Sequence, residues 1–148
     1  MGKLNLVLCL CVPALLGACA LSLQGDSWAD DVSTEDAAAV VAVVEAQISN
    51  LTAPGDGAVF IASDSGPATI PIRAQIGTAL KARGYIIADA SDNASHAHTL
   101  RYQLTTYEGG YILRVFIDDT VTTTHLVKGR SGQLATASSL VAIRETSK

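Results

Sequence analysis

The strongest constraint on the fold is a change of hydrophobic period near residue 99, where helical spacing gives way to strict alternation. Nine of the thirteen threonines lie from this point onward, and threonine is enriched in strands. Two alternating segments, 99–107 and 111–118, flank a Glu-Gly-Gly sequence at 108–110. Such a sequence is typical of a tight hairpin turn. The second half of the chain is therefore predicted to be an antiparallel sheet.

The predicted hairpin has two faces of different chemistry. With Gly109 and Gly110 as its loop, paired positions sum to 219, and one face is apolar. The other face carries aromatic, aliphatic and charged side chains, among them Arg101, Tyr107, Ile112, Arg114 and Phe116. A mixture of this kind is compatible with a partner-binding face. Coverage of these residues by another element of the fold is the alternative.

The first half predicts two helices, each followed by a short strand. Ser33 lies three residues before Asp36, in the manner of a capping box, and apolar residues at helical spacing follow as far as Leu51. A second apolar face begins after Pro71 and ends at Gly84, a typical residue beyond a helix C-terminus. Short apolar strands are expected over 58–62 and 85–88, one after each helix.

Further strands are expected over 121–127 and 134–143. Together the segments predict an α+β fold, with two helices packed on a mostly antiparallel sheet of about five to six strands. This single domain is assigned to residues 33–148, which is an ordinary domain size.

The N-terminus has the pattern of an export signal. Thirteen of residues 1–18 are apolar, Lys3 is the single charge, and the run is too short for a spanning helix of about 20 residues. The run ends in Leu16, Gly17, Ala18 and Cys19, which resembles the lipobox of bacterial lipoproteins. The resemblance implies that Cys19 is acylated and becomes the first residue of the mature chain. An ordinary signal peptide, or a buried apolar helix, is the alternative.

Residues 19–32 are polar and acidic and are expected to form an acylated, flexible tether. Ala20 follows the cysteine, where the lipoprotein resemblance associates aspartate with the inner membrane, so we expect an outer-membrane anchor facing the periplasm. Within the tether, Trp28 is expected either at the lipid interface or packed on protein.

Little in the sequence points to catalysis. Cys9 and Cys11 leave with the leader, so a mature chain acylated at Cys19 keeps no thiol. His96 and His98 lack acidic or cysteine partners at metal-ligand spacing, and solvated loop histidines are the expected state. A net charge of −4 gives no footprint for nucleic acid. We therefore predict a non-enzymatic protein with no metal and no cofactor apart from the covalent lipid.

Several of these features together resemble TrbH, the lipoprotein family of conjugative transfer systems in the type IV secretion class. They are the lipobox, the acidic tether, the helix ending at residues 80–85 (Leu-Lys-Ala-Arg-Gly-Tyr), the Leu-Arg-Tyr strand at 100–102 and the Gly-Gly-Tyr hairpin at 109–111. The resemblance covers nearly the whole chain. It implies a structural protein of the mating-pair apparatus, in contact with the membrane through its lipid and with other envelope proteins.

A carrier or assembly lipoprotein for a lipid or glycan of the outer membrane is the second hypothesis. An apolar groove of several hundred Å³ between helices and sheet would favour that hypothesis. A closed core beneath a flat, exposed sheet face would favour the structural role. A periplasmic hydrolase is a third hypothesis, and it would need a histidine beside a serine or carboxylate in a cleft.

Overall fold

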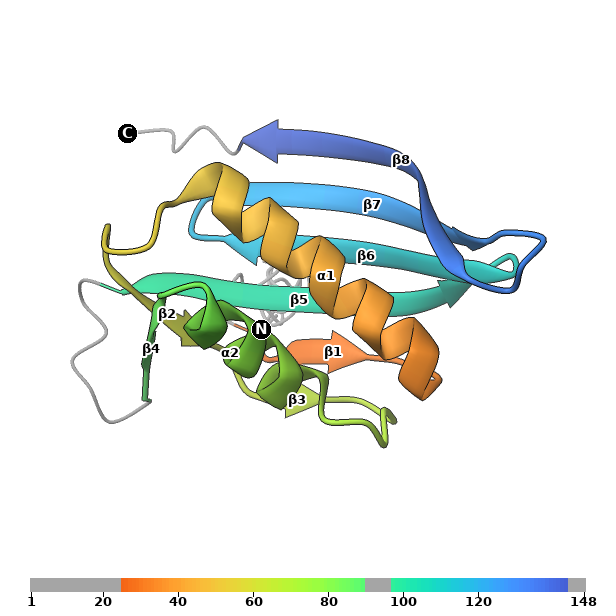
Figure 1. Cartoon of the computed structure of the whole chain (residues 1–148), viewed down its shortest axis with the longest axis horizontal. Helices are drawn as coiled ribbons and strands as arrows, with labels where there is room; N and C mark the ends of the chain where they lie inside the picture. Colours follow the sequence, from red (N-terminus) through yellow and green to blue (C-terminus); the bar gives the residue numbers. More distant parts are fainter. Residues whose placement is uncertain (1–24, 90–96, 144–148) are drawn as a thin grey trace, which may run out of the picture.

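The computed structural model describes residues 25–89 and 97–143 (Figure 1). These residues form two α-helices, α1 (Thr34–Leu51) and α2 (Ile72–Ala82), and an eight-stranded sheet. The strands are β1 (Ser27–Ala29), β2 (Ala58–Ile61), β3 (Asp64–Ser65), β4 (Ile86–Ala88), β5 (His98–Tyr107), β6 (Gly110–Ile117), β7 (Thr120–Lys128) and β8 (Leu134–Ile143). The α+β class predicted from the sequence is confirmed.

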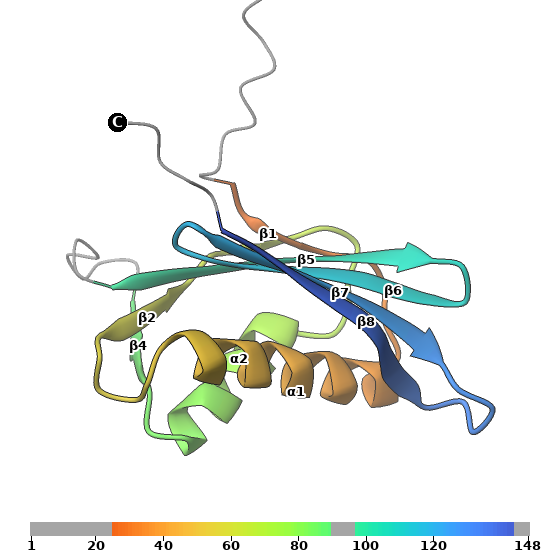
Figure 2. The same ribbon diagram turned by 90° about the horizontal axis from the view of Figure 1, so that it is seen from above.

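The molecule has two layers. Strands β5 to β8 form an antiparallel meander, and both helices pack on the same face of it (Figures 1 and 2). The core between the layers is closed by side chains that are fully buried, such as Val40 and Val44 of α1, Leu80 of α2 and Tyr102 and Leu113 of the sheet. Among residues 25–89 and 97–143, helices therefore cover one face of the sheet and none lies on the other.

Local signals explain both helices. Ser33 is the N-cap of α1, and its hydroxyl accepts a hydrogen bond from the backbone N–H of Asp36 at 3.2 Å. Pro71 precedes α2, and Gly84, with φ of +92°, follows its C-cap. The expected apolar stripes are buried as far as Ile48, whereas Leu51 is exposed at the helix end.

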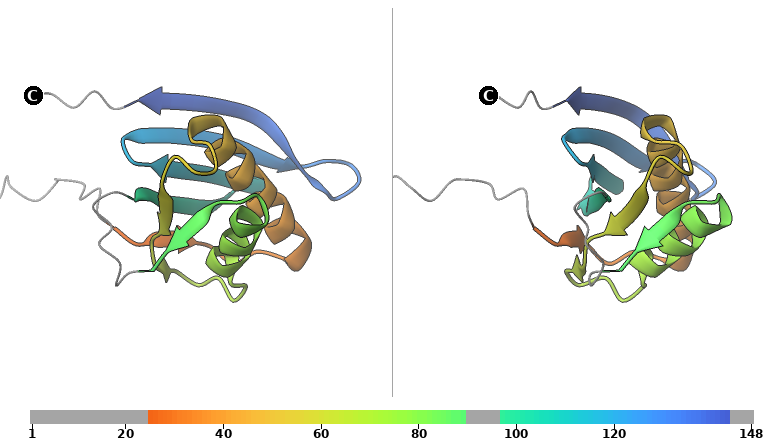
Figure 3. Two further views of the ribbon diagram at one scale, coloured as in Figure 1. Left: turned by 60° about the vertical axis from the view of Figure 1, so that its left-hand side comes forward. Right: turned by 90° about the vertical axis from the view of Figure 1, so that its left-hand side faces the viewer.

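The sheet has more strands than predicted, and part of it is parallel. Strands β1 and β2 both pair in parallel with the same edge of β5, while β3 and β4 add to them in parallel (Figure 3). These four strands have two to four residues each, too few for a clear alternation. The prediction of about five to six strands in a mostly antiparallel sheet counted two of these short strands and overlooked the other two.

Part of the predicted tether belongs to the domain. Ser27–Ala29 is strand β1, the side chains of Ser27 and Ala29 are buried, and Val32 joins the core. The assignment of residues 25–32 to a flexible tether was therefore wrong. Trp28 points away from the core, is 44% exposed, and donates from Nε1 to Asp30 at 3.1 Å.

The hairpin register differs from the prediction by two positions. Tyr107 pairs with Gly110, so Glu108 and Gly109 form the loop and paired positions sum to 217. Both loop residues have positive φ, as a type I′ turn requires. Because side chains alternate with a period of two, a shift of two positions changes each residue's partner but keeps every residue on its predicted face.

Candidate functional site

The candidate site is the sheet face opposite the helices, which we call the open face. On β5, residues 100, 102 and 104 are buried under the helices, so Arg101, Gln103 and Thr105 alternate onto the open face. The strand register places Phe116, Arg114 and Ile112 of β6 directly opposite these three residues. The structure thus brings all five predicted face residues, Arg101, Tyr107, Ile112, Arg114 and Phe116, onto one surface.

Two aromatic contacts organise the open face. The guanidinium carbon of Arg101 lies 4.8 Å from the centre of the Phe116 ring, within the range of a cation–π interaction. Partial burial lowers the pKa of Arg101, but an arginine remains charged at neutral pH. The rings of Tyr107 and His125 meet edge to face, with centroids 5.6 Å apart. The open face therefore carries two arginines, and its aromatic rings are in contact with Arg101 and with His125.

Sequence reasoning missed the contribution of β7 to this surface. His125 lies opposite Ile112, Thr123 opposite Arg114, and Val121 opposite Phe116, so the open face extends across a third strand. Alternation within residues 121–127 carried this signal, but the pairing partner of that strand was needed to interpret it. Arginine and aromatic residues are enriched in protein interfaces, and this surface has both.

A charged cluster lies on the opposite side of the sheet, at the start of α1. The Asp36 side chain is 4% exposed, and its Oδ2 accepts hydrogen bonds from Lys128 Nζ at 2.8 Å and from the Tyr111 hydroxyl at 3.2 Å. Burial by itself would raise the pKa of Asp36, but the ammonium of Lys128 and the Ser33 cap outweigh burial, so the pKa lies below its ordinary value. The cluster ties α1 to β6 and β7.

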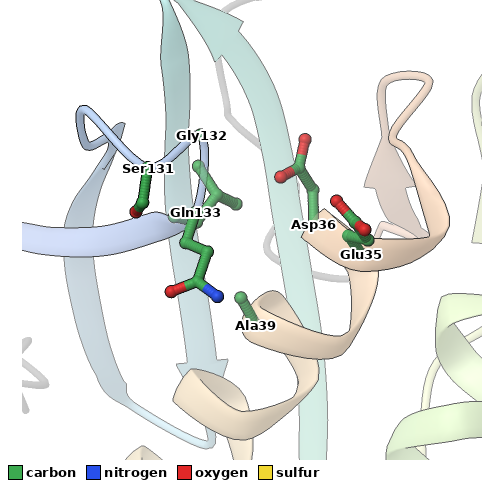
Figure 4. Close-up of a pocket in the computed structure, with 7 residues that line it drawn as sticks. Glu35, Asp36, Ala39, Ser131, Gly132 and Gln133 are labelled. Carbon is green, nitrogen blue, oxygen red and sulfur yellow. The ribbon is translucent and has the colours of Figure 1, made fainter.

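A polar cavity of about 570 Å³ adjoins this cluster. It lies between the first turn of α1 and the β7–β8 loop, and Figure 4 shows Gln133 reaching toward Ala39. Its lining is largely polar: Glu35, Asp36, Ala39, Ser131, Gly132, Gln133 and Leu134. This is not the apolar groove between helices and sheet that a lipid carrier would need.

The two described histidines lie in different places, His98 at the start of β5 and His125 beside Tyr107 on the open face. His98 Nδ1 is 2.7 Å from Asp118 Oδ2 at the end of the sheet, and the backbone N–H of Thr99 donates to the other carboxylate oxygen at 2.9 Å. Both side chains are partly exposed, and neither lines the cavity at α1. Within residues 25–89 and 97–143, no group of three or more histidine, cysteine, aspartate and glutamate side chains could hold a metal. His96 lies outside the described residues.

A second network fixes the strands that the sequence did not reveal. The Tyr102 hydroxyl donates to Asp64, the first residue of β3, and burial raises the pKa of Tyr102. Asp30, which follows β1, accepts from the backbone N–H of Thr106 at 2.7 Å, and this bond lowers the pKa of Asp30. A smaller cavity of about 270 Å³ lies beside β3. These contacts attach β3 and the end of β1 to β5. The open face remains the main candidate surface.

The predicted lipidation site lies outside the described residues. Leu16, Gly17, Ala18 and Cys19 precede residue 25, where the description begins. Of the helices in the described part of the chain, neither has the length and hydrophobicity needed to cross a bilayer.

Comparison with known proteins gives one match. A family model described as conjugal transfer protein TrbH matches residues 23–146. The matched range includes β1, both helices and the complete described sheet, and it confirms the resemblance seen in the sequence. No curated protein and no solved structure matches the chain.

Proposed function

Because the chain belongs to the TrbH family of conjugal transfer proteins, we propose that it is a structural lipoprotein of the mating-pair formation apparatus. In this proposal Cys19 carries acyl chains that hold the protein at the outer membrane, on the periplasmic side. The domain then holds other envelope proteins of the secretion complex, and performs no catalysis and uses no cofactor.

The observation that carries the proposal is the open face. A mixed aromatic, aliphatic and cationic surface spans three strands, and both described helices lie on the other side of the sheet (Figure 2). Arg114 is exposed near its centre, and Arg101 is held against Phe116. A surface of this composition suits a protein partner with acidic and apolar side chains.

Charge reversal on the open face tests this assignment. Arg114→Glu is expected to lower conjugation frequency about ten-fold or more, because like charges across an interface cost several kcal/mol. Lys81→Glu is the matched control, since Lys81 is an exposed cation on α2. Both variants should reach wild-type levels in cells. Equal transfer frequencies for the two variants would contradict a role for the open face.

The lipid anchor requires a separate experiment. Cys19→Ser is expected to move the protein from the outer-membrane fraction to soluble or uncleaved forms, because two or three acyl chains are needed for stable attachment. Sucrose-gradient fractionation and labelling with a clickable palmitate analogue would measure this change. Unchanged fractionation would refute anchoring through Cys19.

Deletion of the gene with no effect on conjugation would refute the structural role itself.

The alternative of a lipid or glycan carrier has less support. The cavity at α1 is lined mainly by polar groups, and the side chains between helices and sheet are closely packed. A carrier that holds an acyl chain buries most of the ligand in an apolar cleft. We therefore assign function to the open face and not to the interior.

A further inference from the structure

Strand β8 ends the sheet with an unusually long and unprotected edge. It has ten residues, Leu134–Ile143, and in the described part of the chain only β7 pairs with it. Its sequence, LATASSLVAI, contains no charged residue and no proline. Natural proteins usually protect a free edge with lysine, proline or a very short strand, because the unpaired backbone groups can bind another strand. Such protection is missing on β8.

The exposed side chains of β8 indicate what kind of element would fit against its free edge. Leu140 is 70% exposed and Val141 is 58% exposed, and neighbouring residues of a strand point to opposite faces of the sheet. A helix or a loop resting on one face could cover only one of the two. A strand added to the edge would lie against both and would also pair the backbone groups.

We propose that the added strand is β8 of a second copy of this chain, in antiparallel orientation about a two-fold axis near Leu140 and Val141. An axis through Leu140 sets Leu140 against its own counterpart and Ser139 against Val141. Because β8 is uncharged, no repulsion opposes the contact. Antiparallel pairing also separates the basic Lys128–Arg130 loops, which parallel pairing would bring side by side.

The other edges of the sheet explain why the assembly would stop at two copies. Strands β3 and β4, at the opposite side, have two and three residues. The described part of each molecule therefore offers one long edge, and an edge paired with itself about a two-fold axis has no backbone groups left for a third copy. The expected product is a closed dimer in which two meanders form one continuous sheet and the two open faces lie side by side.

Disulfide cross-linking of the full chain in its host membranes tests the proposal. Leu140→Cys and Val141→Cys are made separately, together with Ala74→Cys on the exposed side of α2 as the control. After oxidation with copper phenanthroline, at least one of the first two should run at twice the monomer mass on non-reducing gels. The wild type and the α2 control should remain monomeric.

A lysine placed at the proposed two-fold axis provides a second test of the dimer. A lysine at the other of the two positions (Leu140→Lys with Val141→Cys, or Val141→Lys with Leu140→Cys), added to whichever cysteine variant cross-links, should reduce the dimer about ten-fold or more without lowering the amount of protein, because the two lysines would be brought close together at the axis. Thr105→Lys, at an exposed residue of β5, should leave the cross-link unchanged. Absence of a dimer with both edge cysteines overturns the proposal. A cross-link to a different protein overturns it as well, because the occupant would then be a foreign strand. Neither result depends on whether conjugation requires the protein.

Discussion

Gly110→Ala is expected to lower the free energy of unfolding by about 2–4 kcal/mol, because its methyl group would meet the backbone of the next strand. A Cβ at this position lies 2.0 Å from the carbonyl oxygen of Leu126 and 3.0 Å from the Cα of Val127. Backbone atoms in the middle of a sheet cannot turn away as a side chain can. Strand β6 would have to separate from β7 at Gly110, the first residue of β6.

The matched control is the neighbouring glycine. Gly109 has φ of +78°, and a Cβ added to it would meet no atom within 4 Å, so Gly109→Ala should cost only about 1–2 kcal/mol for a left-handed backbone. Urea unfolding of the leaderless chain followed by circular dichroism would measure both variants. A larger loss for Gly109→Ala than for Gly110→Ala would contradict the close approach of β6 and β7.

Lys128→Met is expected to destabilise the domain and lower its urea midpoint at neutral pH, because it leaves the buried Asp36 carboxylate without its counter-ion. Lys128 itself is 45% exposed, so the loss stems from Asp36 and not from the lysine. The double variant with Asp36→Asn should lose less than the sum of the two single variants. A double-mutant cycle in urea tests this coupling, and additive losses would show that the pair contributes nothing.

Acid should weaken the same contact. The folded-state pKa of Asp36 is below its ordinary value, so the unfolded chain binds more protons in acid and unfolding is favoured. The contribution of Asp36 is complete above its unfolded pKa of about 3.9 and is lost as the pH falls through the lower folded pKa. Urea midpoints of wild type and Asp36→Asn should therefore converge below about pH 4. A constant difference between them down to about pH 2 would contradict the assignment.

The prediction from sequence worked where one segment carries its own signal. Ser33, Pro71 and Gly84 marked helix ends through local backbone chemistry, and the strand predicted over residues 134–143 matched β8 at both ends. The register of the hairpin was predicted wrongly. Two adjacent glycines can both be placed in a two-residue loop, and the observed loop contains only Gly109, together with Glu108. Only the structure separates their roles. Gly109 supplies the positive φ of the turn, and Gly110, which has no Cβ, allows the backbone of β7 to approach.

The candidate site was predictable in part. The five open-face residues were placed together because a period of two fixes which side of the sheet a residue occupies, even in the wrong register. Whether these residues would be covered could not be predicted, because that depends on which face of the sheet the helices pack against. His125 and Thr123 joined the surface only once β7 was known to pair with β6.

The sequence by itself determined the α+β class, the caps of both helices, the alternation of the meander and the family, because each depends on residues close together in the chain. Only the tertiary structure decided that β1 and β2 share one edge of β5, that Asp36 meets Lys128, and that β8 is left as a free edge in the described part of the chain. These contacts join residues far apart in sequence. Short strands and single ion pairs leave no periodic signal, and their partners are selected by the packing of the whole domain.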